Sequence, residues 1–352
     1  MAMTTPTLDE FLGKLVGDLG AACSVALVGI GDRLGLYAAL ADGGAQTPAA
    51  LARRTRTDER YVREWLSAQA AAGYVDYDAG AGTFGLNEVQ RLAFADASSP
   101  AHFLGGFQVA RSMFKDLDRV VDAFKSGSGV GWHEHDPELF CGTERFFRSG
   151  YNANLVPSWI PALDGVEAKL RAGARVADVG CGHGASTIIM AEAYPASTFF
   201  GFDYHEPSIA SARQQAEHAG VATRVSFDTA AAKSFSGRDY ALVCIFDALH
   251  DMGDPVGAAR HVREVLEPDG TWLLVEPFAG DRLEQNLNPV GRVFYSASTM
   301  ICTPASRSQE VGLALGAQAG PKRLEAVCRE AGFTRFRVAT QTPFNLVLEV
   351  RP

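Results

Sequence analysis

Apolar residues recur at helical spacing near the start of the chain. Five of them fall on one face of a helix: Phe11, Leu12, Leu15, Val16 and Leu19. The apolar run continues through residues 25–40 with few polar breaks. Helices this apolar need a surface to pack against, and a symmetric second copy of the chain is the simplest one.

The most apolar stretch, residues 19–30, lies between Asp18 and Asp32. A helix of that length is too short to cross a bilayer, so we expect no membrane span. The first ten residues also lack the basic, apolar and small-residue order of a signal peptide. These patterns predict a cytoplasmic protein.

Two short helices and a hairpin are predicted next. A threonine–proline pair starts a helix over residues 48–56, and a threonine–aspartate pair caps another that runs to residue 72. Residues 74–77 and 83–86 alternate like two strands around a glycine-rich turn. Helix, turn, helix and hairpin is the order of a winged helix, which we assign to residues 1–98.

A winged helix can bind DNA, but the charge of this one argues against it. Residues 1–98 contain twelve acidic and eight basic side chains, and the whole chain has a net charge of −9. Such a field repels phosphate backbones. Five arginines between Arg53 and Arg63 form a local cluster, but acidic residues interrupt it. We therefore expect a dimerisation or substrate-covering domain and no nucleic-acid partner.

Residues 99–165 are rich in aromatic side chains and predict a helical connector. They include Phe103, Phe107, Phe114, Phe124, Trp132, Phe140, Phe146, Phe147, Tyr151 and Trp159. A glycine-serine segment at 126–131 could let an aromatic lid move over a pocket.

The connector also contains four possible metal ligands in a row, at residues 133–136. Neighbours this close do not easily converge on one ion without a third, distant group, so we expect no metal there. The six cysteines are far apart and form no CxxC pair, which indicates reduced structural thiols.

From Val166 onward strands alternate with helices, which predicts an α/β domain over residues 166–352 with a mostly parallel sheet covered on both faces. Seven strands are expected, at residues 175–179, 197–203, 223–227, 240–246, 271–276, 334–340 and 345–350. Helices are expected between them, for example at 207–219, 255–266 and 321–331.

The first of these strands leads into a glycine-rich loop, VADVGCGHGAS. Gly180, Gly182 and Gly184 allow a tight turn and close approach of a ligand before the next helix. The spacing also fits the looser dinucleotide fingerprint. Asp203 ends the second strand, where a carboxylate can accept hydrogen bonds from a ribose diol. A dinucleotide and other nucleoside-containing cofactors both carry such a diol, so this residue does not distinguish between them.

Two further polar segments follow the third and fourth strands. Asp228 and Thr229 provide acceptors beside small residues, where an adenine amino group could bind. Residues 246–255 follow the fourth strand. Ligand sites in open α/β sheets lie beyond the carboxyl ends of the strands, so we expect all four segments to form one site.

The glycine loop, the Asp203 segment and the Asp228 segment, in this order, resemble those of class I S-adenosylmethionine-dependent methyltransferases. The closing helix and two strands are similar to that family's final antiparallel hairpin. The segments LHDMGDP and VREVLEPDGTWLLVEP are similar to small-molecule O-methyltransferases, which carry a winged-helix dimerisation domain. The resemblance implies a Rossmann-like seven-stranded sheet with an antiparallel last strand, a homodimer and S-adenosylmethionine as cofactor.

The resemblance also implies roles for single residues. The methionine part of the cofactor would lie against the glycine loop, the ribose on Asp203, the adenine on Asp228 and Thr229, and Tyr204 would stack on the base. The expected cofactor-binding residues are Asp178, Gly180, Cys181, Gly182, Asp203, Tyr204, Asp228, Thr229, Phe246 and Tyr151. The expected substrate-binding residues are Phe147, Trp132 and Met252.

His250 aligns with the family's catalytic histidine, a general base that takes the proton of the acceptor hydroxyl. The family commonly has His-Asp-Trp where this chain has His250-Asp251-Met252, which changes the pocket wall. A histidine that is merely hydrogen-bonded at a strand end is the alternative. No metal is implied.

The sequence thus predicts methyl transfer from S-adenosylmethionine to a small, largely apolar acceptor, at a hydroxyl oxygen. Two other functions fit parts of the pattern. One is a transcription regulator that keeps the methyltransferase fold as a ligand sensor, and the other is an NAD-dependent oxidoreductase.

Overall fold

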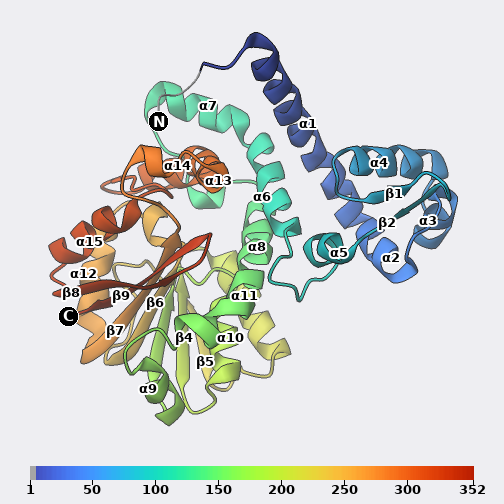
Figure 1. Ribbon diagram of the computed structural model, residues 1–352. Coiled ribbons are helices and arrows are strands. Elements are labelled where there is room, and N and C mark those ends of the chain that lie inside the picture. The colour runs from blue at the N-terminus through green and yellow to red at the C-terminus, as the bar shows by residue number, and fades with distance from the viewer. Residues whose placement is uncertain (1–4) are drawn as a thin grey trace. The chain divides into compact units, whose positions relative to one another are not determined.

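The computed structural model describes residues 5–352, which form two compact units (Figure 1). Residues up to Arg111 and the segment Cys141–Ser149 make the first unit, and Ser112–Phe140 with Gly150–Pro352 make the second. The predicted connector over residues 99–165 is thus not a unit of its own. The reason is the packing of two helices within the first unit, α6 (Leu104–Lys115) and α8 (Glu138–Asn154). They approach so closely at Gly105 and Gly142 that a side chain at either position would collide with the backbone of the other helix.

The first unit has the predicted winged-helix order. Its remaining elements are α1 (Leu8–Arg33), α2 (Leu36–Gly43), α3 (Pro48–Thr55), α4 (Glu59–Ala71), β1 (Asp76–Asp78), β2 (Thr83–Gly85) and α5 (Glu88–Phe94). The caps expected at two helix starts are present: the Thr47 side chain accepts from the amide of Ala50, and that of Asp58 accepts from the amides of Arg60 and Tyr61. β1 and β2 pair antiparallel as the wing, and Gln46 adds a bridge to Phe84.

Tyr37 lies at the centre of the core of this unit. Its ring stacks on Phe94 at a centroid distance of 4.9 Å and meets Trp65 edge-on at 5.1 Å. Its hydroxyl donates to Oε1 of Gln69 at 2.6 Å, and both residues are fully buried. Burial raises the pKa of Tyr37, so the hydroxyl remains a donor.

α1 differs from the prediction in length. It is a single helix of 26 residues, of which residues 19–30 are only a part, and it is long and apolar enough to cross a membrane by length and composition. The stretch itself is too short to span a membrane, but the helix that contains it is not, so the argument from length against a membrane span does not hold. A capping box of Thr7 and Glu10 fixes its start. Six apolar side chains of its first half are 46–71% exposed: Leu8, Phe11, Leu12, Leu15, Val16 and Leu19.

The second unit is built on a seven-stranded sheet with the strand order β5-β4-β3-β6-β7-β9-β8. The strands are β3 (Arg175–Val179), β4 (Thr198–Asp203), β5 (Val225–Thr229), β6 (Tyr240–Phe246), β7 (Leu266–Pro277), β8 (Arg335–Gln341) and β9 (Asn345–Arg351). β3 to β7 pair in parallel, whereas β9 runs antiparallel to both of its neighbours, as predicted. Every residue of β6 is buried, as expected for a central strand of a parallel sheet covered on both faces.

Helices and short turns complete the second unit. The α-helices are α7 (Leu117–Ser126), α9 (Val166–Ala172), α10 (Ala185–Ala193), α11 (Glu206–His218), α12 (Pro255–Val265), α13 (Pro289–Ala297), α14 (Thr303–Arg307) and α15 (Gly320–Glu330). The shorter helices are η1 (Trp132–Glu134), η2 (Leu155–Trp159), η3 (Leu249–Asp251), η4 (Leu283–Gln285) and η5 (Ser298–Cys302). Two of these, η2 and η5, are π-helical turns, a form that is frequent at functional sites.

The Tyr37–Gln69 hydrogen bond gives a stability prediction for the first unit. Replacing Gln69 by Leu should lower the free energy of unfolding by about 1–3 kcal/mol, because the buried hydroxyl loses its acceptor. The double variant Tyr37→Phe/Gln69→Leu should recover most of this loss, since it removes both polar partners. Urea denaturation followed by tryptophan fluorescence measures both effects. A double variant as unstable as the two single variants combined would contradict the pairing.

Candidate functional site

The glycine-rich loop between β3 and α10 has the backbone that the sequence predicts. Gly180, Gly182 and Gly184 all have positive φ angles, of 76°, 52° and 80°. A Cβ on Gly184 would lie 2.6 Å from the ring of Phe227, so this position accepts no side chain. The loop therefore brings backbone, and not side chains, to the carboxyl end of β3.

Asp178 is buried beneath this loop at the end of β3. One of its oxygens, Oδ2, accepts hydrogen bonds from the hydroxyls of Ser186 and Thr187, both at 2.6 Å. The other, Oδ1, is buried and has no hydrogen-bond partner. Burial raises the pKa of Asp178 to about 6, although the two hydroxyls oppose the shift. The unpaired oxygen is suited to a donor such as an ammonium group.

Asp203 lies beside the loop at the end of β4. Its Oδ2 accepts from the amide of Gly182 at 2.9 Å, and its Oδ1 accepts from the amide of His205 at 2.8 Å. Desolvation raises the pKa of this carboxyl, and the two amides oppose that shift. Each oxygen keeps a second lone pair, so the half-buried carboxylate can still accept hydrogen bonds from a diol.

Three other predicted cofactor residues lie around Asp203. Thr229 pairs with Asp203 across the β4–β5 ladder, and Asp228 precedes it. Both are exposed, as is Tyr204. Residues 228 and 229 belong to β5, which begins and ends two residues later than predicted. Cys181 is buried, and desolvation raises the pKa of its thiol well above the usual range, so it is a packing residue within the loop.

Phe246, the last residue of β6, and Tyr151 of α8 form an aromatic cluster. Their ring centroids are 5.3 Å apart, and Trp159 of η2 joins them. The Tyr151 hydroxyl donates to Oδ2 of Asp247 at 3.4 Å, and the amide of Asn345 approaches the other oxygen at 3.3 Å. Asp247 has a left-handed φ of 50°, which is uncommon for a residue other than glycine.

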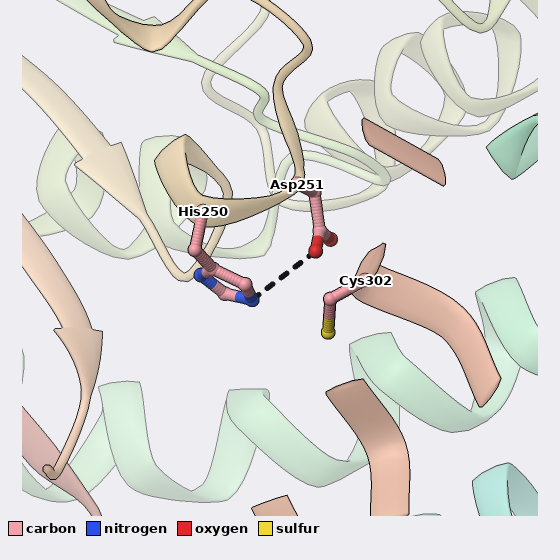
Figure 2. A group of neighbouring side chains, drawn as sticks. All are labelled: His250, Asp251 and Cys302. Carbon is pink, nitrogen blue, oxygen red and sulfur yellow. Dashed lines mark ion pairs between the residues drawn. The ribbon is translucent and has the colours of Figure 1, made fainter. Parts of the chain in front are cut away.

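His250 lies on η3, directly after β6, and is 3% exposed. Its Nδ1 is 2.6 Å from Oε2 of Glu276 at the end of β7, and its Nε2 is 3.2 Å from Oδ1 of Asp251. Figure 2 shows that the thiol of Cys302, from η5, faces the same ring. Burial lowers the pKa of His250, but the carboxylates of Asp251 and Glu276 outweigh it and hold the pKa well above its usual range.

The predicted substrate residues lie in different parts of the chain. Met252 lies two residues after His250, is half-buried and packs on the core of the second unit. Trp132 of η1 packs edge-on against Phe140, and Phe140 stacks on His205 at 4.6 Å next to the Asp203 segment. Phe147 belongs to the first unit, where it packs against Phe146. The structure therefore brings Trp132 and Met252 into the unit that carries the cofactor residues.

The row of possible metal ligands at 133–136 does not converge. His135 Nδ1 pairs with the buried Asp116 at 2.9 Å, Glu134 accepts from the amide of Gly131, and Asp136 pairs with Lys115 at 3.0 Å. These three groups thus have separate partners within the protein.

Sequence reasoning missed two polar residues beside His250, Glu276 and Cys302, and it gave no role to Asp247 and Asp251 of the segment after the fourth strand. Glu276 could have been found, because it is a charged residue in an otherwise apolar strand, LLVEP, and buried charges need partners. Cys302 gave no such signal. It lies in a stretch, residues 283–307, in which the sequence pattern placed no element.

Comparison with known proteins agrees with this geometry. Residues 170–319 match the family model described as a methyltransferase domain, and residues 21–94 match that of an Rv2258c-like winged HTH domain. A 165-residue stretch is 32% identical to 27-O-demethylrifamycin SV methyltransferase of Amycolatopsis mediterranei. It makes up 46% of this chain and 55% of the relative, so the match spans about half of that protein.

Solved structures share the whole fold. Human N-acetylserotonin methyltransferase in complex with SAM has a TM-score of 0.71 at 17% identity, over 100% of this chain and 99% of that one. The calicheamicin-biosynthesis methyltransferase CalO1, in its SAH-bound form, has a TM-score of 0.66 at 21% identity, over 99% and 100% of the two chains. The mitomycin 7-O-methyltransferase MmcR has a TM-score of 0.69 at 19% identity, over 97% and 98%.

These matches favour the methyltransferase interpretation of the glycine loop over the NAD-dependent one. The family model extends from within α9 to the residue before α15 and includes all four segments at the carboxyl ends of the strands. The chain therefore has an N-terminal region that matches a winged HTH domain and a region that matches a methyltransferase domain, and it shares the fold of these methyltransferase structures.

Proposed function

We propose that this protein transfers a methyl group from S-adenosylmethionine to a hydroxyl oxygen of a small, largely apolar acceptor. The observation that carries the proposal is the pair of carboxylates at the ends of β3 and β4. Asp178 keeps one oxygen unpaired and buried, and Asp203 is held by two amides with lone pairs to spare. An ammonium and a ribose diol are the groups that such carboxylates bind.

The residues present fit this cofactor. Its sulfonium supplies an activated methyl carbon, and no lysine or arginine clamp is needed because the molecule carries no phosphate. Asp178 and the backbone of the glycine loop would hold the methionine part, Asp203 the ribose, and Asp228, Thr229 and Tyr204 the base. Phe246 and Tyr151 would close the other side of the site. The enzyme's main contribution is then to position the donor and the acceptor.

Oxygen is the favoured acceptor atom for two reasons. Two similar proteins whose names give the methylated position are O-methyltransferases, one of a rifamycin and one of mitomycin. In addition, His250 lies directly after β6, where the methyl donor and acceptor should meet. Trp132 and Met252 are apolar side chains of the same unit and support an apolar acceptor.

We propose that His250 takes the proton of the acceptor. Glu276 fixes its ring through Nδ1, which leaves Nε2 to act. A base must be neutral, and the flanking carboxylates favour the protonated ring. A cationic sulfonium nearby opposes that effect, because a like charge lowers the pKa of an imidazole.

We further propose a cytoplasmic homodimer that forms through the exposed apolar side chains of α1. Their exposure, together with an acidic winged helix, favours a protein partner over DNA. A DNA-binding regulator remains the second candidate function, because the matched domain is a winged HTH domain.

Removing the Asp203 carboxylate tests the cofactor assignment. Asp203→Ala should weaken binding of S-adenosylmethionine by about 1.5–3 kcal/mol, measured by calorimetry, because charge-assisted hydrogen bonds are lost. Asp269→Ala, which removes an exposed carboxylate that pairs with Lys169, is the matched control and should bind normally. Unchanged affinity in Asp203→Ala, or tight binding of NAD to the unmodified protein, would refute the assignment.

Turnover of the His250→Ala variant tests the role of the histidine. Its rate should fall roughly a hundredfold or more while cofactor affinity stays nearly unchanged, because general-base assistance contributes that much to the rate and little to binding. Acceptors can be found by screening phenols and hydroxylated polyketides for transfer of a labelled methyl group. His218→Ala, at an exposed position on α11, is the control. A His250→Ala enzyme with the original rate and pH profile would remove this role and leave the methyltransferase proposal intact.

The oligomeric state tests the role of α1. Sedimentation at micromolar concentration should give a dimer, and Leu12→Glu/Leu15→Glu should give a monomer, since charges would enter the buried face. Val89→Glu alters another exposed apolar residue, on α5, and should remain dimeric. A monomeric unmodified protein, or sequence-specific DNA binding at physiological salt, would contradict the proposal.

A further inference from the structure

A second pair of a carboxylate and an imidazole lies in the second unit, apart from His250 and Glu276. His135 directly follows η1, and its Nδ1 is 2.9 Å from Oδ2 of Asp116, which directly precedes α7. Both residues are buried, with 4% exposure each. The same carboxylate oxygen accepts from the amide of Asp136 at 3.1 Å. An ionised carboxylate can only accept hydrogen bonds, so the hydrogen of the neutral imidazole lies on Nδ1.

The other ring nitrogen of His135 is unused within the protein. Nε2 is buried and has no hydrogen-bond partner among residues 5–352. With the hydrogen on Nδ1, this atom carries a lone pair that can accept one hydrogen bond. Leaving a buried acceptor unpaired destabilises a fold, and the few such atoms in native proteins often have a functional reason. His135 is therefore a candidate for contact with a bound molecule.

The segment that carries His135 lies next to the residues that follow β4. The ring of Phe140 stacks on that of His205 at a centroid distance of 4.6 Å, and the ring of His133 meets that of Tyr204 edge-on at 6.2 Å. Tyr204 and His205 come directly after the last residue of β4, the carboxylate expected to bind the ribose. The segment therefore borders the part of the site expected to hold the cofactor.

The same segment also contacts the helices that lie beside His250. The amide of Val130 donates to the carbonyl oxygen of Pro304 at 3.0 Å. Pro304 comes two residues after Cys302, and the thiol of Cys302 faces the ring of His250 (Figure 2). The segment around residues 130–140 thus borders the part of the site where the acceptor should react as well.

The imidazoles of His135 and His250 share one electrostatic neighbour, Asp251. Burial raises the pKa of the Asp251 carboxyl, and positive charge on either imidazole opposes this shift. His250 is the closer ring, with Nε2 at 3.2 Å from Oδ1 of Asp251. Because charge–charge effects weaken with distance, the influence of His135 on the same carboxyl agrees with its position beside the acceptor side of the site.

We propose that Nε2 of His135 accepts a hydrogen bond from a second hydroxyl of the methyl acceptor, one that is not methylated. The acceptor is then a largely apolar molecule with at least two hydroxyls. This inference rests on the proposed function, since it assigns a further group on the same acceptor. His250 takes the proton of the hydroxyl that is methylated, His135 binds the other, and Asp116 is a positioning residue that keeps the lone pair on Nε2.

The role predicts a preference among acceptors. A site built to bind a hydroxyl discriminates against the analogue that lacks it, because a buried polar group then stays unpaired. The cofactor does not contact His135 in this arrangement, so its affinity should not depend on the residue. A histidine that only stabilises the fold would instead affect all acceptors alike.

Pairs of acceptors that differ by one hydroxyl test the proposal. Suitable probes are the dihydroxynaphthalenes paired with 1-naphthol and 2-naphthol, and hydroxylated polyketides paired with their deoxy analogues, each assayed for transfer of a labelled methyl group. For the best acceptor, kcat/KM should exceed that of its partner with one hydroxyl fewer by about tenfold or more. His135→Leu should bring this ratio close to one. Asp116→Asn should lower it less, because the amide can still accept from Nδ1 but can also donate to it.

The ratio compares two acceptors on one sample, so it does not depend on the fraction of folded enzyme. His261→Leu is the matched control: it replaces a half-buried histidine of α12, whose Nε2 lies 2.8 Å from the carbonyl oxygen of Phe235, and should keep the ratio. A best acceptor with a single hydroxyl, or a ratio that His135→Leu leaves unchanged, would overturn the proposal while the methyltransferase function stands. Absence of transfer to every probe, with the cofactor bound, would count against the methyltransferase function and this inference together.

Discussion

Glu276 is buried at the carboxyl end of β7, and both of its oxygens hold the segment that follows β6. One accepts from the amide of Leu249 and the other lies against Nδ1 of His250. A buried carboxylate without such partners would cost several kcal/mol, so the strand and the loop are tied to a single arrangement. The orientation of His250, and with it the chemistry on the acceptor side of the site, depends on this contact.

The cofactor side follows the same principle with different residues. Asp178 and Asp203 end neighbouring parallel strands, and each is anchored by hydroxyls or amides from the loop beside it. Anchoring leaves the remaining lone pairs directed outward, which is what a preorganised binding site needs. The glycine at 184 lets the helix α10 start against Phe227 without a side chain between them. The parts of the site expected to bind the methyl donor and the methyl acceptor thus meet at one edge of the sheet, because the parallel strands all end there.

His250 shows why a site is more than its motif. The sequence identified the residue and its place after the fourth strand, and a general base was the natural interpretation. The structure adds two carboxylates and a thiol around the ring. These neighbours decide whether the imidazole carries a proton or accepts one, since both depend on the charge within a few ångströms.

The sequence by itself determined the elements and their order, because hydrophobic periodicity, helix caps and glycines act locally. It therefore predicted the winged helix, the seven strands, and Asp178, Asp203 and His250 at strand ends, whereas the antiparallel last strand came from the resemblance to a known family. Only the tertiary structure decided the length of the exposed α1, the division of the connector between two units, and the meeting of Glu276 and Cys302 with His250. The last two features depend on contacts between residues far apart in the chain, and no local pattern records such contacts.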